Sequence, residues 1–151
     1  MAEFEIADLR AMRAFALGIG CNLKGGELIE LVSDLGGGKT TFVKGLAEGA
    51  GSRDHVSSPS FTIRNDYAAK DFAIAHFDFY RLNEPGIIKD MLEEIMGDPS
   101  CVTVIEWAGL VKDVLPENHI RLTIQVVGET GRKIQIDCPP ALAYVLDGVN
   151  Q

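Results

Sequence analysis

The sequence predicts an α/β fold in which helices cover a mixed sheet that has a parallel centre and antiparallel hairpin additions. Two continuous apolar runs, 28–32 and 101–105, are typical of strands that are buried on both faces. Helical patterns alternate with strands early in the chain, whereas pairs of β-rich runs separated by short turns appear later. We expect the 151 residues to form one domain, 1–151, with a substantial hydrophobic core.

The first predicted element is a helix over 9–19. Asp8 precedes it and is a suitable N-cap, because a short carboxylate can accept a hydrogen bond from the first turn. Apolar side chains recur at helical spacing, at Leu9, Met12, Phe15 and Ile19. Gly18 and Gly20 are expected to fray the end of this helix.

The remaining elements follow from apolar periodicity and from the turn residues between them. Gly49 and Gly51 close the second helix, and Pro139-Pro140 opens the last one. Short turns at 69–71 and 128–131 each separate two β-rich runs, which predicts two hairpins. The predicted order is strand 28–32, helix 41–49, polar loop 52–60, strands 61–68 and 72–80, helix 84–96, strand 101–105, strands 119–127 and 132–138, and helix 140–147.

The turn between strand 28–32 and the second helix reads Ser-Asp-Leu-Gly-Gly-Gly-Lys-Thr-Thr, residues 33–41. Glycines let the backbone curl until its N–H groups converge on phosphates, and the helix N-terminus adds unpaired donors. Lys39 would reach the β- and γ-phosphates of a nucleotide, and the Thr40 hydroxyl would ligate magnesium. The strand–loop–helix context, more than the Gly-Lys-Thr triplet itself, therefore predicts a P-loop NTPase-like, three-layer fold. Ser33 replaces the usual first glycine, which bears on nucleotide affinity because serine resists positive φ.

Two carboxylates follow buried strands. Asp78 lies near the end of the run 72–80, and Glu106 directly follows the second continuous apolar run. In open α/β sheets ligands bind outside the carboxyl ends of the strands, so we expect both carboxylates to lie near Lys39. A magnesium triphosphate requires a cradle, a lysine, a hydroxyl facing the metal and a carboxylate for metal or water. An aspartate at a strand end is by itself more often a cap; the shared position favours a functional role.

Three residues close to these carboxylates in the sequence can be explained by structural roles alone. Trp107 is expected in the core, because a tryptophan is more often buried than part of a recognition surface. His76 is equally well read as a satisfied, half-buried side chain or as a functional one. Arg81 is expected to pair with a nearby acid, unless it serves the site.

Composition and charge restrict the class of function. The net charge of −8 argues against an autonomous nucleic-acid-binding surface, so a role in nucleic-acid chemistry would require partners that supply a basic groove. The cysteines Cys21, Cys101 and Cys138 are isolated and odd in number, which is typical of a reducing cytosol. The acidic start predicts no secretory or transit peptide, and no apolar run approaches the length of a membrane helix.

Several blocks, in this order, resemble the TsaE family, the bacterial ATPase subunit of the machinery that makes threonylcarbamoyladenosine in tRNA. The resemblance extends over about residues 5–138 and rests on the blocks 34–42, 56–62, 76–82, 104–107 and 114–116. Many ATPases share the phosphate loop, whereas His-x-Asp-x-Tyr-Arg-Leu followed by Glu-Trp is far more specific. The chain departs from the family pattern at Ser33, at Ser60 in place of threonine, and at Ala108 in place of proline.

The resemblance implies a role for each matching residue. Lys39, Asp78 and Glu106 would be catalytic, and Thr40, Glu106 and Asp78 would serve the magnesium ion, with the two carboxylate roles not separated. The loop Ser58-Pro59-Ser60 would act as a switch that senses the γ-phosphate. The implied nucleotide-binding residues are Asp34, Leu35, Gly36, Gly37, Gly38, Lys39, Thr40, Thr41 and Ser60.

The same resemblance implies ATP and Mg²⁺ as ligands and a cytoplasmic ATPase that is weak alone. Its partners would be the TsaD and TsaB proteins, which stimulate ATP hydrolysis and are reset by it between turnovers. The tRNA would be contacted only through that complex, and no membrane would be involved. This division of labour agrees with the acidic charge of the chain, which need not hold tRNA itself.

Two other functions fit the same residues. A small-molecule kinase would use Asp78 as the base toward an acceptor hydroxyl and Arg81 as a charge clamp. The segment 82–100 is poor in arginine, which argues against the arginine-bearing lid of such a kinase. Alternatively, ATP would be a structural ligand of a binding module, and Glu106→Ala would then leave partner-dependent activity intact. GTP is disfavoured because the sequence contains no Asn-Lys-x-Asp motif.

Overall fold

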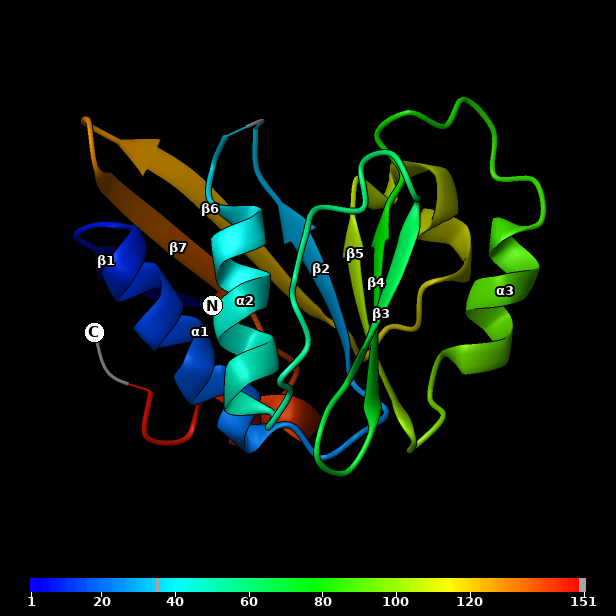
Figure 1. Ribbon diagram of the computed structural model, residues 1–151, viewed down its shortest axis with the longest axis horizontal. Helices are drawn as coiled ribbons and strands as arrows, with labels where there is room; N and C mark the ends of the chain where they lie inside the picture. Colours follow the sequence, from blue (N-terminus) through cyan, green and yellow to red (C-terminus); the bar gives the residue numbers. More distant parts are fainter. Residues whose placement is uncertain (35, 150–151) are drawn as a thin grey trace.

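The computed structural model describes residues 1–34 and 36–149. In this part of the chain seven strands form one sheet, in the order β1-β7-β6-β2-β5-β4-β3 (Figure 1). The strands are β1 (Ala2–Ile6), β2 (Leu28–Val32), β3 (Arg64–Ala68), β4 (Ala73–Asp78), β5 (Cys101–Glu106), β6 (Ile120–Val127) and β7 (Gly131–Asp137). The four central strands, β6, β2, β5 and β4, run parallel, and β1, β7 and β3 are added antiparallel. The predicted mixed sheet with a parallel centre is confirmed.

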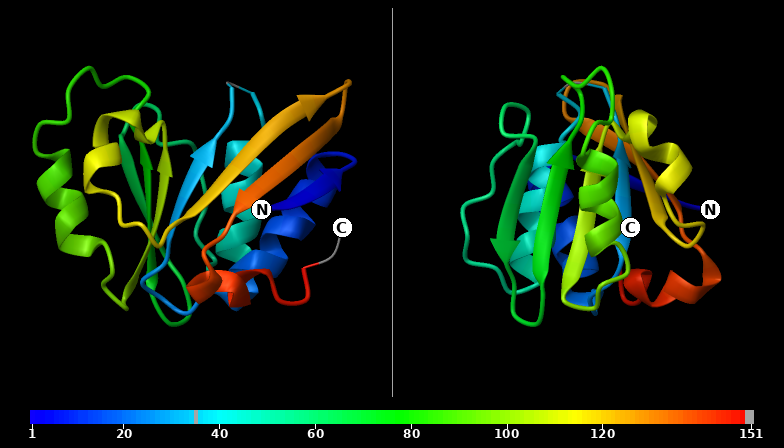
Figure 2. Two further views of the ribbon diagram at one scale, coloured as in Figure 1. Left: turned by 180° about the vertical axis from the view of Figure 1, so that it is seen from behind. Right: turned by 90° about the vertical axis from the view of Figure 1, so that its right-hand side faces the viewer.

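Helices cover both faces of the sheet, which gives three layers (Figures 1 and 2). On one face lie α1 (Leu9–Asn22) and α2 (Lys39–Gly49); on the other lie α3 (Ile88–Ile95) and the 3₁₀ helix η1 (Ala108–Val114). The central strand β5 explains why both faces are covered, since all its side chains are buried and they point alternately to the two faces of the sheet. Its Val102 and Val104 belong to the core beneath α1 and α2, whereas Cys101 and Ile105 pack on the α3 side.

Helix α1 begins as predicted and ends later. The Asp8 carboxylate accepts a hydrogen bond from the Ala11 N–H at 2.8 Å, which confirms the N-cap. The helix continues to Asn22, so the predicted fraying at Gly20 is wrong. A Cβ at Gly20 would lie 2.1 Å from the Leu46 carbonyl oxygen of α2. This glycine therefore permits the close approach of two helices and does not end one.

Other boundaries differ from the prediction for local reasons. Strand β3 begins at Arg64 and not at 61, because a turn closed by the Ile63 N–H on the Pro59 carbonyl precedes it. The last helix is a 3₁₀ helix, η2 (Pro140–Leu146), packed against α1. Strand β1 was not predicted. It is only five residues long, and its formation depends on pairing with β7, which lies far away in the sequence. Both predicted hairpins form, β3–β4 and β6–β7.

The parallel centre brings three strand ends to one edge of the sheet. Asp78, at the end of β4, is the register partner of Glu106, at the end of β5. Leu31 of β2 pairs with Glu106 on its other side, and the glycine-rich loop begins two residues later. The loop and both carboxylates therefore meet at this edge, as the sequence predicts. Among the described residues, no helix is long and apolar enough to cross a membrane.

Candidate functional site

The glycine-rich loop curls through two left-handed residues before α2 begins. Gly36 has φ +79° and Gly38 has φ +105°, values that glycine adopts without strain. Gly38 is the N-cap of α2 and offers no side chain to the first turn of that helix. Donors at the start of α2 are thus left for an anion, and the positive end of the helix dipole points the same way.

Ser33, which stands in place of the usual first glycine, does not adopt the positive φ that serine resists. Of the non-glycine residues that the structure describes, only Ile63 and Trp107 have positive φ. The Ser33 hydroxyl donates to the Asp34 carbonyl at 3.0 Å and lies over the next turn of the loop. A Cβ at Gly37 would lie 1.7 Å from that hydroxyl oxygen, so the serine is accommodated by the glycine opposite it.

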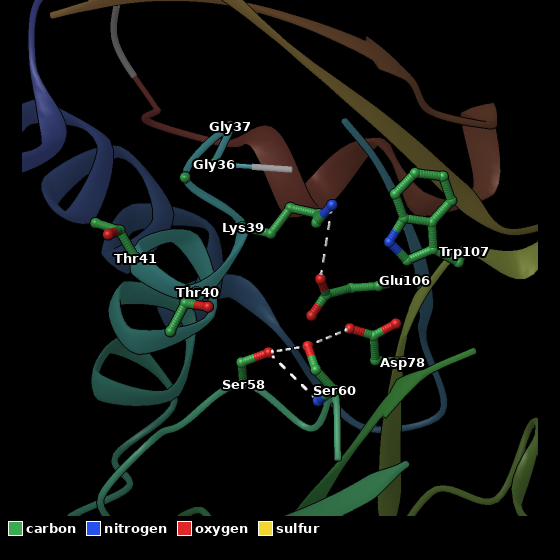
Figure 3. A pocket seen from close by; sticks show the side chains of 11 residues that line it. Gly36, Gly37, Lys39, Thr40, Thr41, Ser58, Ser60, Asp78, Glu106 and Trp107 are labelled. Atoms are coloured by element: carbon green, nitrogen blue, oxygen red, sulfur yellow. Dashed lines mark hydrogen bonds and ion pairs between the residues drawn. The ribbon is translucent and has the colours of Figure 1, made fainter. Parts of the chain in front are cut away.

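A pocket of about 260 Å³ lies between this loop and the strand ends (Figure 3). That volume is slightly below the range of about 300–1,000 Å³ for small-molecule sites, which suits a phosphate chain with the nucleoside extending outside. The residues that line it are Gly36, Gly37, Gly38, Lys39, Thr40, Thr41, Ser58, Ser60, Asp78, Glu106 and Trp107. Most of the predicted site residues are therefore brought together.

Lys39 and Glu106 face each other across the pocket. The Lys39 Nζ lies 3.9 Å from Glu106 Oε1 and donates to the Ser33 carbonyl at 3.1 Å. Lys39 is 8% exposed, Glu106 is 2% exposed and Asp78 is 4% exposed, so all three charged groups are buried. The Lys39 ammonium would attract an anionic ligand, and the two carboxylates would attract a cation bound together with it.

Asp78 is connected to the loop that carries Ser58 and Ser60. Its Oδ2 accepts from the Ser60 hydroxyl at 3.1 Å, and its Oδ1 accepts from the Tyr80 N–H at 2.9 Å. The hydroxyls of Ser58 and Ser60 lie 2.7 Å apart (Figure 3). We call residues 57–60 the serine loop. It forms one wall of the pocket and is attached directly to a candidate catalytic carboxylate.

Trp107 and His76 are not placed as their structural explanations predict. Trp107 is 36% exposed, lines the pocket and has a left-handed backbone (φ 57°, ψ 54°), so the expected core position is wrong. Its ring lies 4.9 Å from Lys39 Nζ and 4.9 Å from the Tyr80 ring, measured to ring centroids. His76 is fully buried and not half-buried, and its Nε2 lies 2.6 Å from Glu106 Oε2.

Three other predicted residues do not point into the pocket, or cannot be placed. Asp34 does not line it; its carbonyl accepts from the Gly37 N–H and shapes the loop. Leu35 lies outside the described residues. The Arg81 guanidinium stacks 4.3 Å from the Phe61 ring centroid and is not part of the pocket lining. The expected ion pair of Arg81 with an acid is not the contact that the structure shows.

Arg132, on β7, was not predicted as a site residue from the sequence. Its Nε donates to the Gly37 carbonyl at 2.9 Å, and its Nη1 donates to the carbonyls of Thr130 and Gly131. Arg132 therefore braces the glycine-rich loop from the antiparallel side of the sheet. No local pattern marks it, because the contact joins residues 95 positions apart.

The donor set fits a magnesium ion shared with a phosphate. Among the described residues, no group of three or more His, Cys, Asp or Glu could hold a metal by itself. The pocket nevertheless presents the Thr40 hydroxyl and the carboxylates of Asp78 and Glu106, which are hard oxygen ligands. Mg²⁺ commonly takes one or two carboxylates together with substrate phosphates, which is the arrangement that these residues permit.

The sheet order, the covering helices and the glycine-rich loop before α2 define an α/β protein with a P-loop NTPase-like fold. Within that class the sequence comparison is specific, since the family model "Threonylcarbamoyl adenosine biosynthesis protein TsaE" matches residues 6–134. The chain belongs to the TsaE family.

Individual relatives agree with this assignment. The tRNA threonylcarbamoyladenosine biosynthesis protein TsaE of Bacillus subtilis is 37% identical over 111 residues, covering 74% of this chain and 69% of that protein. The protein of the same name from Treponema pallidum is 33% identical over 123 residues, covering 78% and 87%. The crystal structure of YdiB from Bacillus subtilis superposes with a TM-score of 0.78 at 28% identity, covering 98% of this chain and 93% of that one.

Proposed function

We propose that this chain binds and hydrolyses magnesium ATP as a subunit required for threonylcarbamoyladenosine modification of tRNA. The observation that carries the proposal is the buried Lys39–Glu106 pair, 3.9 Å apart at the N-terminus of α2. A charged pair this deeply buried is unfavourable unless it is well compensated, so its position at the positive end of a helix dipole points to a ligand. Membership of the TsaE family supports the same interpretation.

Each residue has a distinct task in this proposal. The loop N–H groups and Lys39 hold the β- and γ-phosphates, while Thr40 and Glu106 hold the metal side of the substrate. The bound Mg²⁺ supplies charge neutralisation between the phosphates. Asp78 positions the attacking water or supports the metal, and it does so from a hydrogen bond with Ser60. Gly36, Gly37, Gly38, Thr41 and Ser60, which line the pocket, complete the proposed contacts with the nucleotide.

The serine loop provides a route from the γ-phosphate to a partner. Ser58 and Ser60 lie beside the pocket and hydrogen-bond to each other, and Ser60 also donates to Asp78, so a phosphate that competes for these hydroxyls would reposition the loop. We propose that the TsaD–TsaB complex reads this position, stimulates hydrolysis and is reset by it in the cytoplasm. The net charge of −8 supports tRNA contact through the complex only.

The test is phosphate release from magnesium ATP, measured with and without the TsaD and TsaB proteins of the same organism. We expect slow turnover alone and faster turnover with the partners. Glu106→Gln should lower kcat by about 10²-fold or more, which is the usual effect of removing a catalytic base or a charge that stabilises the transition state. Glu94→Gln, which changes an exposed glutamate on α3, is the matched control and should leave kcat unchanged.

Two outcomes would replace the proposal. Turnover indifferent to TsaD and TsaB would favour the kinase, and small hydroxylated acceptors would then be screened with Asp78 as base. The position of Arg81, stacked on Phe61 and outside the pocket lining, already speaks against its use as a charge clamp there. Partner-dependent modification that survives Glu106→Ala would instead make ATP a structural ligand.

A further inference from the structure

A row of buried side chains connects Glu106 with the serine loop from behind the pocket. His76 of β4 is 0% exposed, and its Nε2 lies 2.6 Å from Glu106 Oε2. On the other side of the ring, Nδ1 lies 3.3 Å from the hydroxyl of Tyr67, on β3. That hydroxyl donates its single proton to the Ser57 carbonyl at 2.9 Å, so its oxygen accepts from Nδ1–H, and both ring nitrogens of His76 act as donors in this row. The row therefore begins at a proposed catalytic carboxylate and ends in the loop that lines the same pocket.

The serine loop is thus tied to β4 in two places. At the front, Ser60 donates to Asp78, and at the back, Ser57 is reached through Tyr67 and His76. His76 and Asp78 are two residues apart on one strand, so both ties arrive on the same face of β4. A displacement of the loop would disturb both ties, and the rear tie leads directly to Glu106.

Packing alone does not account for His76. A fully buried imidazole is unfavourable unless its nitrogens are hydrogen-bonded, and an apolar side chain would fill the same space without that requirement. Glu106 has one oxygen toward Lys39 and the other held by His76, so His76 restricts rotation of the carboxylate. Burial raises the pKa of Tyr67, which keeps its hydroxyl protonated as the donor to Ser57.

We infer that His76 is a positioning residue that fixes the Glu106 carboxylate for ATP hydrolysis, and that Tyr67 extends this restraint to the serine loop. The inference rests on the proposed function, because it assigns Glu106 to that reaction. The orientation of Glu106 and the position of the loop are then coupled through one buried row. A γ-phosphate or a partner that moves the serine loop therefore changes the orientation of the Glu106 carboxylate through this row.

The first test compares two amides at position 76. The side-chain nitrogen of glutamine falls near the position of Nε2, whereas that of asparagine falls near Nδ1. His76→Gln keeps a donor toward Glu106 and should hold kcat within about threefold of wild type. His76→Asn loses that donor and should lower kcat roughly 10- to 100-fold, with the KM for ATP little changed because Lys39 and the glycine loop remain. Equal losses in both variants, or a change in KM alone, would overturn the positioning role.

The second test compares two donors to the same atom. Asn65 Nδ2 also donates to the Ser57 carbonyl, at 3.2 Å; its side chain contacts Tyr67 but, among the described residues, makes no hydrogen bond to His76 or Glu106. Tyr67→Phe and Asn65→Ala should both accelerate amide hydrogen exchange in the serine loop. Only Tyr67→Phe should also lower kcat, by several-fold. If both variants lower kcat equally, the loop is merely tethered and the coupling is refuted.

The exchange measurement also separates this inference from the proposed function. His76→Gln, which has no nitrogen near the position of Nδ1, loses the contact with Tyr67 and should accelerate exchange of the serine loop amides with no nucleotide present; unchanged exchange contradicts the coupling. If the wild-type chain shows no ATP turnover with its partners, the proposed function fails, and exchange still decides the coupling. If the wild type turns over ATP and both amides at 76 behave alike, only the inference fails. Should His76→Asn not fold, Tyr67→Phe against Asn65→Ala decides the matter.

Discussion

Replacing Asp78 by asparagine should abolish ATP turnover and at the same time stabilise the fold. Asp78 and Glu106 are register partners on adjacent parallel strands, and both are buried, with Lys39 3.9 Å from Glu106. An asparagine at this position would keep both hydrogen bonds, because its oxygen can accept from the Tyr80 N–H and its amide can donate to the Ser60 hydroxyl. The substitution therefore removes a charge with little loss of bonding.

The size of the effect follows from the strand spacing. If the two carboxylates are separated by the usual strand spacing of about 4.8 Å, they repel by roughly 3 kcal/mol at an effective dielectric constant of about 20. Attraction to Lys39 is lost at the same time and offsets part of that gain. We expect a net increase in the free energy of unfolding of about 1–2 kcal/mol. For a chain of this length that is a rise in Tm of roughly 2–8 °C.

The assay is thermal unfolding followed by circular dichroism in EDTA without nucleotide, so that no cation offsets the repulsion. Asp66→Asn is the control, since Asp66 is an exposed carboxylate on β3 and its loss should change stability by less than about 0.5 kcal/mol. A fall in Tm for Asp78→Asn would refute the reasoning. It would mean that Asp78 acts chiefly as a structural acceptor for the turn that follows β4.

Three further predictions concern the loop and the helices. Gly37→Ala should raise the KM for ATP about tenfold or more in ATPase kinetics, because the new Cβ would lie 1.7 Å from the Ser33 hydroxyl oxygen. Adding Ser33→Gly removes that hydroxyl and should restore the KM. Arg132→Ala should weaken nucleotide binding roughly tenfold in calorimetry by removing a charged hydrogen bond to the loop, whereas Lys133→Ala, on the same strand, should not. Gly20→Ala should lower the melting temperature by several degrees, since its Cβ would lie 2.1 Å from a carbonyl oxygen of α2; an unchanged value would show that the two helices can separate without loss.

The strand, loop and helix around Lys39 were predictable because each signal is local. A continuous apolar run, glycines followed by Gly-Lys-Thr and a helical repeat need no knowledge of distant residues. The meeting of Asp78 with Glu106 was also predictable, since parallel strands present their carboxyl ends at one edge. Sequence reasoning thus found the pocket by combining residue type with the rules of sheet topology.

Burial and backbone conformation at the site were less predictable. Trp107 follows a fully buried strand, and its apolar ring suggests the core, but a left-handed backbone turns it toward Lys39. Ile63 has the same unusual sign of φ just beyond the serine loop. A β-branched residue and a tryptophan are poor choices for that conformation by propensity, so only the surrounding structure imposes it. Both positions adjoin the pocket walls, where strain of this kind tends to concentrate.

The antiparallel half of the sheet also contributes more to the site than its sequence suggests. The β6–β7 hairpin reads as an addition to the sheet edge, and β1 pairs with it from the start of the chain. Yet β7 carries Arg132, whose guanidinium holds the Gly37 carbonyl and the carbonyls of its own turn. In a planar trans peptide the Gly38 N–H points opposite to the Gly37 carbonyl, so Arg132 also fixes the direction of that donor. The hairpin therefore preorganises the phosphate loop from outside, and loosening β1 or β7 should weaken nucleotide binding before it unfolds the parallel centre.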